Sequence, residues 1–511
     1  MIPASWKRET RTGILWSIST FAAGRVLTLI ATIVLARVLV PAEFGVVAAI
    51  LAFVSLLELG TDFGMKATVV YEQDRIDTDR LHSAFTLNLI IAGGLCAAGI
   101  AAAPSIASLF GVPDQAGLFR LAMLSLVLTG LGNIPDAILL RDLALRSRVL
   151  PELTRNVASG AVSVILAVGG MGAASLVIGL LAGRAAWIMM LWIVTGYRPR
   201  LRIDRHIAWS MGSYGLGATV LSVIAVIATR ADVVVVGTVI GPAALGIYTI
   251  AYRLPELAIR SVSWSFSRVA FPALSKMRAL DRSQLADAAT TLLRYQGLVT
   301  VPIAVMLAVL ASPLVIVLFS STWGEAGPVM SALAVVAAFD ALAFPFGDAL
   351  KSIRRQPTLI AINAVNIPLL IAVMIAVAPI GLVWVAWAIA AQAFAHLTMV
   401  TIVTTRALRI QPHRLVAALR PVLAASLGVL LGSGGIRLLW PDPTIEPLLA
   451  GLAAGSASGL AATRLFAPAT FRELTAVVGR ALRRRGAPKG TLDEPGAAAA
   501  HLAPSRAGMS S

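Results

Sequence analysis

The chain has very little of what soluble proteins use to face water or to bind metal ions. Only 13% of its 511 residues are charged, 58% are hydrophobic, and the mean hydropathy is +0.85. This composition excludes an ordinary water-soluble domain. The single cysteine, Cys96, excludes an internal disulfide and a cysteine-based metal cluster, and its small-residue surroundings, AGGLCAAG, favour a packing role.

The sequence also lacks the usual signs of covalent catalysis. It contains no phosphate-binding glycine loop, no cluster of metal ligands and no nucleophile with a base at a useful spacing. We therefore expect no catalytic residue, no metal site and no cofactor. The formal net charge of +17 could suggest nucleic acid, but the basic residues lie between apolar runs, where they mark one side of a membrane. We expect no nucleic-acid partner.

Long apolar runs are what the chain has in abundance. They recur from near residue 13 to near residue 465, and each can cross a hydrocarbon core of roughly 30 Å as a helix. No cleavage site follows the first run, so we expect it to be retained. The sequence predicts an all-α polytopic membrane protein with about fourteen transmembrane helices. Their expected ranges are 13–37, 44–66, 83–108, 117–140, 149–171, 174–195, 208–236, 243–267, 292–318, 326–348, 358–379, 381–404, 416–437 and 445–465.

Lysine and arginine residues occupy alternate connections between these helices. They precede the first helix and follow the second, fourth, sixth, eighth, tenth and twelfth, whereas the intervening connections contain essentially none. By the positive-inside rule, this alternation predicts that both termini lie in the cytoplasm. The connections on the other side are short, which leaves no room there for a catalytic domain.

Two stretches of the chain resemble each other at a constant offset. ARVLVPAEFGVVAAIL (36–51) aligns with GTVIGPAALGIYTIAY (237–252), which pairs Pro41 with Pro242 and Gly45 with Gly246. Six predicted helices separate the copies, so both have one orientation, and an axis along the membrane normal would relate two pseudo-symmetric six-helix lobes. The predicted divisions are a cytoplasmic N-terminus (1–12), an N-lobe (13–200), a C-lobe (201–407), two C-terminal helices (408–465) and a disordered, partly basic cytoplasmic tail (466–511).

Both repeat regions and the motif FPALSKM carry a resemblance to a known family. GILWSISTFAAGRVLTLIATIVLARVLVPAEFGVVAAILAFVSLLELGTDFGMKATVV and RADVVVVGTVIGPAALGIYTIAYRLPELAIRSVSWSFSRVAFPALSKM are similar to the polysaccharide transport or Wzx-type flippases. These belong to the multidrug/oligosaccharidyl-lipid/polysaccharide exporter superfamily. The resemblance covers residues 10–410 and implies a V-shaped cavity between two lobes that works by alternating access.

The resemblance also implies a substrate and a location. The substrate would be an undecaprenyl-diphosphate-linked oligosaccharide, moved from the cytoplasmic to the periplasmic leaflet of the bacterial inner membrane. The product would be a surface polysaccharide such as O-antigen, capsule or exopolysaccharide. The implied partners are this lipid-linked oligosaccharide diphosphate and membrane lipids; a polysaccharide polymerase, a chain-length regulator and coupling to a proton or sodium gradient are further expectations to test.

Several charged residues lie inside the predicted helices. A charge at the centre of a bilayer costs roughly 2.5–3.5 kcal/mol on insertion scales, so these side chains should face protein or a water-filled cavity. They are Arg25, Glu58, Asp62, Arg120, Arg184, Arg230, Asp232, Arg253, Glu256, Arg260 and Asp340.

Spacing groups some of these charges into two stripes, each on one side of a helix. Because the second and eighth predicted helices are equivalent in the repeat, we expect the two stripes to face each other across the lobe interface. The stripes are Glu58, Asp62 and Lys66 on the second helix, and Arg253, Glu256 and Arg260 within AYRLPELAIRSVSWSF (251–266) on the eighth.

The arginines suit a diphosphate, whose negative charge must cross a region of low dielectric constant. Guanidinium groups bind phosphate through two parallel hydrogen bonds, and arginines also mark the cavities of the similar lipid II flippases. Arg25, Arg253 and Arg260 are therefore the candidate substrate-binding residues. The candidates for lining the cavity or forming a gate are Glu58, Asp62, Lys66, Arg230, Asp232, Glu256 and Asp340.

The alternative is that each cation is paired with a neighbouring acid, which would lock helices together or form a gate. We favour such pairing for Arg120 and Arg184, which lie near predicted helix edges, while both roles stay open for Arg25 and Arg253. The pairs to consider are Arg230 with Asp232, Lys66 with Asp62, and Arg260 with Glu256.

Two other residues inside helices bear on the mechanism. Pro255 removes a helix hydrogen bond next to Arg253 and can kink the eighth helix. His396 is well inside a predicted span; we interpret it as a buried, hydrogen-bonded side chain rather than a proton carrier.

A flippase is the leading hypothesis, and two other classes stay open. A membrane-embedded glycosyltransferase or polysaccharide polymerase would need a substantial outer loop with acidic catalytic residues, which the short outer connections argue against. A multidrug exporter of the same superfamily commonly has twelve helices and binds cations through carboxylates, whereas this chain has more predicted helices and many intramembrane arginines.

Overall fold

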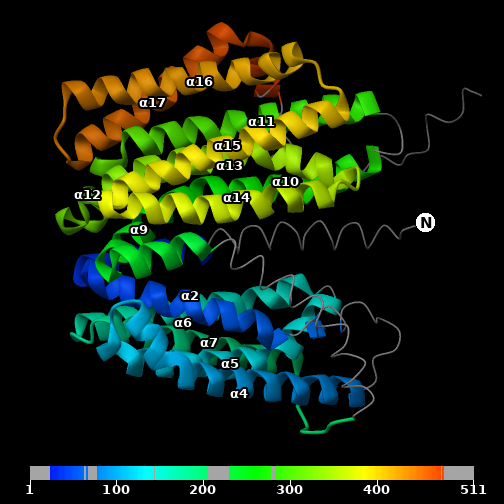
Figure 1. Cartoon of the computed structure of the whole chain (residues 1–511), viewed down its shortest axis with the longest axis vertical. Coiled ribbons are helices and arrows are strands. Elements are labelled where there is room, and N and C mark those ends of the chain that lie inside the picture. Colours follow the sequence, from blue (N-terminus) through cyan, green and yellow to red (C-terminus); the bar gives the residue numbers. More distant parts are fainter. Residues whose placement is uncertain are drawn as a thin grey trace, which may run out of the picture.

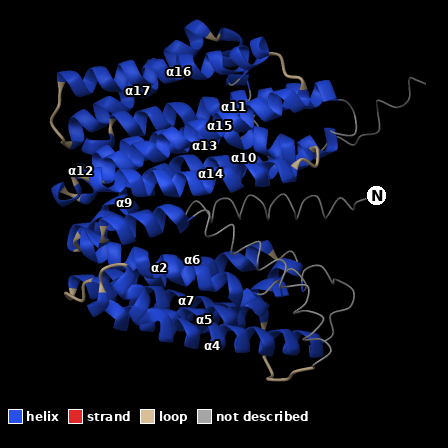
Figure 2. Cartoon of the chain, in the orientation of Figure 1, coloured by secondary structure: helices blue, strands red, loops and turns tan. Residues whose placement is uncertain are grey.

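The computed structural model shows that the protein is helical (Figure 1, Figure 2). It describes residues 24–62, 65–66, 69, 78–142, 144–204, 230–277, 282–473 and 475–476, and these contain no strand. Ten helices in this part of the chain are long and apolar enough to cross a membrane. The all-α prediction is confirmed. The count of fourteen stays a prediction, because the expected helices 13–37 and 208–236 extend outside the described residues.

The described helices form two bundles (Figure 1). The first contains α2 (Pro41–Asp62), α4 (Thr78–Leu109), α5 (Ala116–Arg141), α6 (Leu145–Val168) and α7 (Ala173–Thr195). The second contains α9 (Pro242–Pro255), α10 (Ser261–Met277), α11 (Arg282–Val309), α12 (Ala311–Phe319), α13 (Ala326–Ser352), α14 (Gln356–Val377), α15 (Leu382–Leu408), α16 (Pro412–Leu439) and α17 (Ile445–Phe466). A helix over residues 24–38 precedes α2.

Observed helices differ from the predicted ranges where polar sequence continues a helix beyond its apolar part. The predicted helix 243–267 runs on to Met277, and the predicted helix 292–318 divides at Leu310 into α11 and α12. The start of the predicted tail is helical over 468–473, where Glu473 accepts a hydrogen bond from Tyr295 (2.8 Å). Hydropathy therefore located the helices better than their ends. The predicted N-terminus 1–12 and the tail beyond 476 lie outside the described residues.

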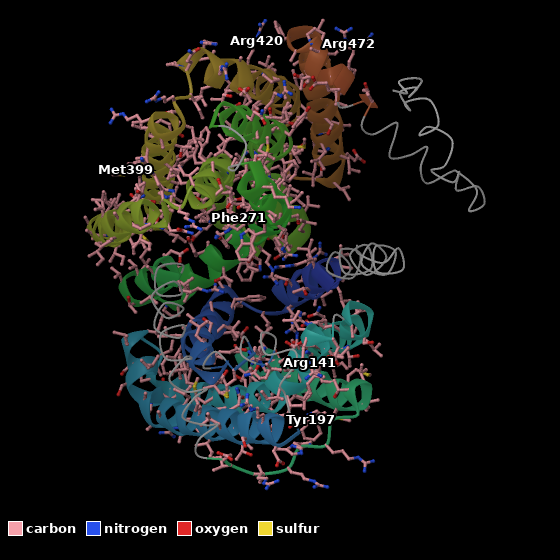
Figure 3. All side chains as sticks on the ribbon, turned by 90° about the vertical axis from the view of Figure 1, so that its right-hand side faces the viewer. Arg141, Tyr197, Phe271, Met399, Arg420 and Arg472 are labelled. Atoms are coloured by element: carbon pink, nitrogen blue, oxygen red, sulfur yellow. The ribbon has the colours of Figure 1, made fainter. Side chains whose placement is uncertain are left out.

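Small residues set the packing within each bundle. Between membrane helices, association depends on close backbone approach rather than on hydrophobic burial from water. A Cβ added at Gly183 of α7 would lie 2.8 Å from the Arg155 carbonyl of α6, and one at Gly428 of α16 would lie 2.5 Å from the Ser458 carbonyl of α17. Side chains fill the space inside each bundle (Figure 3), and large apolar side chains such as Met399 cover its outside. The chain is built as a multi-pass membrane protein.

The two repeats meet where α2 and α9 begin, an end of the molecule that we call the proline end. α2 starts at Pro41 and α9 at Pro242, which suits proline because the first helical N–H has no partner. A Cβ on Gly45 would overlap the Pro242 carbonyl, and a Cβ on Gly246 would overlap the Pro41 carbonyl. This reciprocal contact is what a two-fold relation between the halves produces, and it explains the glycine in each copy.

Candidate functional site

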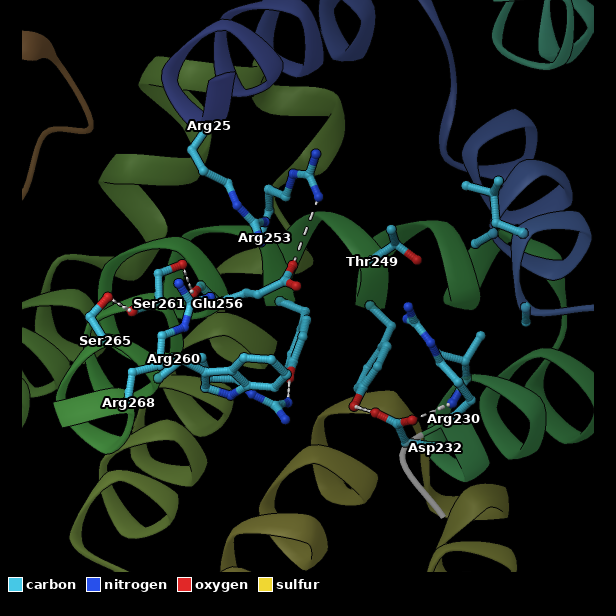
Figure 4. Close-up of a pocket in the computed structure, with 17 residues that line it drawn as sticks. Arg25, Arg230, Asp232, Thr249, Arg253, Glu256, Arg260, Ser261, Ser265 and Arg268 are labelled. Carbon is cyan, nitrogen blue, oxygen red and sulfur yellow. Dashed lines mark hydrogen bonds and ion pairs between the residues drawn. The ribbon is translucent and has the colours of Figure 1, made fainter. Parts of the chain in front are cut away.

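Next to the glycine contact, the two bundles enclose a cavity of about 490 Å³, here called the central cavity (Figure 4). Helix 24–38 and α2 line one side, and residues 230–233, α9 and α10 line the other. Five arginine and two acidic side chains face it, which is a formal excess of three positive charges. The charged residues are Arg25, Arg230, Asp232, Arg253, Glu256, Arg260 and Arg268.

Residues that are equivalent in the repeat face each other across this cavity. Ala48, Leu51 and Ala52 of α2 line it, as do their aligned partners on α9. Those partners are Thr249, Tyr252 and Arg253. On its own side α2 thus supplies apolar side chains, and α9 supplies polar ones on the other.

A π-helical turn, η3 (Glu256–Arg260), shapes the polar wall. Pro255 has no N–H to continue the α-helical ladder, and directly after it the Ser261 N–H bonds to the Glu256 carbonyl, five residues back. Such turns occur often at functional sites. A π-helical turn therefore follows Pro255, whereas a kink of the helix there stays a prediction. The expected stripe of Arg253, Glu256 and Arg260 does share one wall of the cavity.

Arg253 is only weakly paired. Its Nη1 lies 3.8 Å from Glu256 Oε2, which is longer than a good hydrogen bond. Its Nε is buried and has no hydrogen-bond partner among the described residues. Arg25 reaches toward it from helix 24–38, so that two positive charges lie within electrostatic range of each other (Figure 4). An arrangement of this kind favours an anion between them.

Arg260 and Asp232 belong to an aromatic network instead of the ion pairs that the sequence left open as an alternative. Arg260 donates to the Tyr252 hydroxyl and lies 5.7 Å from that ring. Tyr252 stacks on Tyr248 at 6.2 Å, and Tyr248 donates to Asp232 at 2.6 Å. Within the described ranges, neither Arg260 with Glu256 nor Arg230 with Asp232 forms an ion pair, so these two alternative pairings are not observed.

Asp340 lies behind this network on α13. It is half-buried, does not line the central cavity, and is within electrostatic range of Arg260, Asp232 and His396. These groups connect the cavity wall to the interior of the second bundle.

The expected polar stripe on α2 does not face the cavity. Glu58 accepts two hydrogen bonds of 2.8 Å from the Nη atoms of Arg184, which lies in the middle of α7 rather than at a helix edge. Lys66 lies 3.4 Å from Asp136 of the same bundle, and Asp136 also binds Arg148 at 2.7 Å. The expectation that the two stripes meet across the lobes is wrong for these residues, while pairing of Arg184 is confirmed.

The Asp62 side chain lies outside the described residues, so its proposed pairing with Lys66 stays a prediction. Arg120 is exposed on α5 and lies away from the central cavity.

The proline end holds inter-bundle contacts that were not predicted. Arg37 donates to the carbonyls of Val317 (2.7 Å) and Leu318 (3.1 Å) at the end of α12. Trp323 donates through Nε1 to the Ala36 carbonyl at 2.6 Å. Periodicity could not reveal them, since backbone carbonyls accept these hydrogen bonds. With the glycine contact, they join the two bundles at this end.

Trp264 and Arg268 also line the cavity and were not singled out from sequence. They follow Arg260 at intervals of four residues, so extending the predicted stripe along the same helix face would have included both.

Comparison with known proteins gives a consistent result. A family model described as polysaccharide biosynthesis protein matches residues 34–328. The succinoglycan biosynthesis transport protein ExoT of Rhizobium meliloti is 27% identical over 338 residues, covering 66% of this chain and 67% of ExoT. The lipopolysaccharide biosynthesis protein WzxC of Escherichia coli is 24% identical over 353 residues, covering 69% of this chain and 71% of WzxC. The resemblance found in the sequence is confirmed.

Solved structures show the same fold. The lipid II flippase MurJ in its inward closed conformation superposes with a TM-score of 0.70 at 18% identity, covering 90% of this chain and 100% of MurJ. An inward-facing multidrug resistance MATE family transporter of the MOP superfamily gives a TM-score of 0.60 at 15% identity, covering 75% of this chain and 94% of the transporter. The two-bundle architecture is therefore one that known membrane transporters share.

Proposed function

The chain belongs to the polysaccharide biosynthesis protein family, and from this premise we propose that it is a flippase for undecaprenyl-diphosphate-linked oligosaccharide in the bacterial inner membrane. The observation that carries the proposal is the arginine-rich central cavity between the two bundles. The names of ExoT, a transport protein, and of MurJ, a lipid II flippase, support the same class. The product would be a surface polysaccharide such as O-antigen, capsule or exopolysaccharide.

The cavity is suited to the diphosphate part of such a substrate. A diphosphate crossing the bilayer loses water, and guanidinium groups can replace that hydration with paired, charge-assisted hydrogen bonds. Arg25, Arg253 and Arg260 are the proposed ligands. The unpartnered Nε of Arg253 and the excess of positive charge support this assignment over a purely structural role.

We further propose that transport proceeds by alternating access. With both termini in the cytoplasm, the proline end faces the periplasm and is the closed end of the cavity. The substrate then enters from the cytoplasmic leaflet, and its release requires the α2–α9 contact to separate. The expected energy source is a proton or sodium gradient, and the expected partners are a polysaccharide polymerase and a chain-length regulator.

The names of the relatives favour a transporter over an enzyme. The excess of arginines argues against a cation-exporting multidrug transporter, because a cation would be repelled from this cavity.

Deletion of the gene tests the function directly. The mutant should accumulate the lipid-linked repeat unit in the cytoplasmic leaflet and lose its surface polymer. Normal polymer output, or accumulation of an unextended sugar acceptor, would contradict a flippase. Proteoliposomes containing the purified protein and a fluorescent polyprenyl-diphosphate-linked sugar would then measure transbilayer movement, with and without imposed proton or sodium gradients.

A further inference from the structure

One tryptophan in the polar wall of the central cavity has an unusual environment. Trp264 of α10 lines the cavity, and 55% of its surface is exposed. In the part of the chain that the structure describes, it makes no ring contact and its Nε1–H donates to no residue. By contrast, the indole N–H groups of Trp323 and Trp192 both bind backbone carbonyls, of Ala36 and Leu131. The free face and the free donor of Trp264 are both available to a ligand.

Polar groups flank this indole along the helix. Arg260 and Arg268 lie four residues before and after Trp264, so all three share one face of the helix and all three line the cavity. Ser265 lies beside them and donates to the Ser261 carbonyl at 2.9 Å, which leaves its oxygen lone pairs as acceptors. Ser261, Ser265, Arg260 and Arg268 lie close together in this part of the cavity (Figure 4).

An aromatic face next to hydroxyl and guanidinium groups matches the chemistry of a sugar. A pyranose ring has an apolar C–H face, which packs on an indole, and a rim of hydroxyl groups, which need hydrogen-bond partners. A purely apolar ligand would leave Ser265 and Arg268 unused, and an anion alone would leave the indole unused.

The position of Trp264 also agrees with the order of groups in the substrate. The first sugar of a lipid-linked oligosaccharide is attached directly to the diphosphate. Trp264 follows Arg260 by four residues, or about 6 Å along the helix axis, which is the scale of one sugar ring. A diphosphate held by Arg253 and Arg260 therefore places the first sugar at the indole.

We infer that Trp264, with Ser265 and Arg268, forms a saccharide subsite that binds the sugar next to the diphosphate. The inference rests on the proposed flippase function and assigns different parts of the substrate to different parts of the cavity. Arg25, Arg253 and Arg260 bind the diphosphate, and the α10 face beyond them distinguishes a glycosylated lipid from a bare one.

Binding of two synthetic lipids to the purified full-length protein in nanodiscs tests the subsite. The lipids are a short-chain polyprenyl diphosphate and the same lipid carrying one galactose. We expect the wild-type protein to bind the galactose-bearing lipid about tenfold more tightly, a gain in the range of one aromatic contact plus a hydrogen bond. Trp264→Ala should abolish this preference and leave the affinity for the bare diphosphate unchanged, whereas Trp264→Phe should retain part of it.

Two further variants separate the possible failures. Trp387→Ala removes an exposed tryptophan of α15 outside the cavity and should change neither affinity. Arg253→Gln should weaken both lipids equally. If the wild-type protein binds both lipids equally, or if Trp264→Ala keeps the preference or weakens both alike, the subsite is disproved while the flippase remains. If the wild-type protein binds neither lipid, the proposed function fails, and the subsite fails with it.

Discussion

Charges inside the first bundle and charges between the two bundles are held in different ways. Arg184, within the first bundle, is bound by both carboxylate oxygens of Glu58 at 2.8 Å and also contacts Thr129. Arg253 lies between the bundles, where its Nη1 is 3.8 Å from a carboxylate oxygen of Glu256. Its Nε has no hydrogen-bond partner among the described residues. Both are arginines in membrane helices, where an unpaired charge is costly.

This difference separates a structural role from a binding role. A charge that holds helices together gains most when its partners are fixed and close. A charge that must exchange ligands during transport gains from partners that are weak, since a strong internal pair would compete with the substrate. We therefore propose that Arg184 serves stability and that Arg253 serves transport, and substitution of each residue tests its role.

Removal of Arg184 should have the largest effect on stability. Arg184→Leu leaves Glu58 without its ion-pair partner, and we expect the free energy of unfolding to fall by about 3 kcal/mol, the low end for a broken buried pair because Glu58 is about one-third exposed. Thermal unfolding of the purified protein would show this loss. The double variant Glu58→Leu with Arg184→Leu should recover most of it; a double variant as unstable as the single one would contradict an isolated structural pair.

Removal of the charge at Arg253 should slow transport and leave stability nearly unchanged. Arg253→Gln should lower the rate of flipping about 30-fold, because one charge-assisted contact to phosphate contributes about 2 kcal/mol. Its unfolding midpoint should stay near the wild-type value, since little pairing is lost. Arg202→Gln, at an exposed pair with Asp79 outside the cavity, is the matched control. If Arg253→Gln and Arg202→Gln flip the lipid at equal rates, Arg253 is not part of the transport site.

The same comparison shows what the sequence could predict. The aligned glycines define which face of α2 and α9 meets the other bundle. Arg253 follows Gly246 by close to two helical turns and returns to that face, whereas Glu58 follows Gly45 by about three and a half turns and points away from it. The all-α fold, the repeat and the place of Arg253 in the cavity were therefore predictable. The position of Glu58 relative to Gly45 along the helix likewise predicts that Glu58 does not face the other bundle.

Other features had no signal in one sequence. The partners of Arg37 and Trp323 are backbone carbonyls, and any residue supplies a carbonyl. The Glu58–Arg184 pair joins α2 to α7, and no spacing rule connects residues on different helices. Tertiary packing decides such contacts, so local pattern cannot reveal them.

The contact of Gly45 and Gly246 with the opposite proline carbonyls is expected to hold the cavity closed at the proline end. Gly246→Ala places a methyl group against the Pro41 carbonyl, and relief of this overlap costs about 1–3 kcal/mol unless the bundles separate. Thr249→Cys introduces a reporter thiol in the cavity. We expect this thiol to react with a membrane-impermeant maleimide, added from the periplasm, at least fivefold faster in the Gly246→Ala variant than in the protein with the native glycine. The native Cys96 is buried and gives little background. Gly94→Ala, at a glycine with open space around it, should leave the rate unchanged.

A single hydrogen bond at the proline end gives the smallest effect and the sharpest control. Trp323→Phe removes the donor to the Ala36 carbonyl but keeps an aromatic ring near Phe44, so it should weaken the closed state by about 1 kcal/mol. Labelling of the same reporter should rise about fivefold. Trp192→Phe deletes the same kind of donor, to the Leu131 carbonyl inside the first bundle, and should not change labelling. Because both substitutions are chemically identical, a rise in both would mean that general loosening, rather than closure between the bundles, controls access to the cavity.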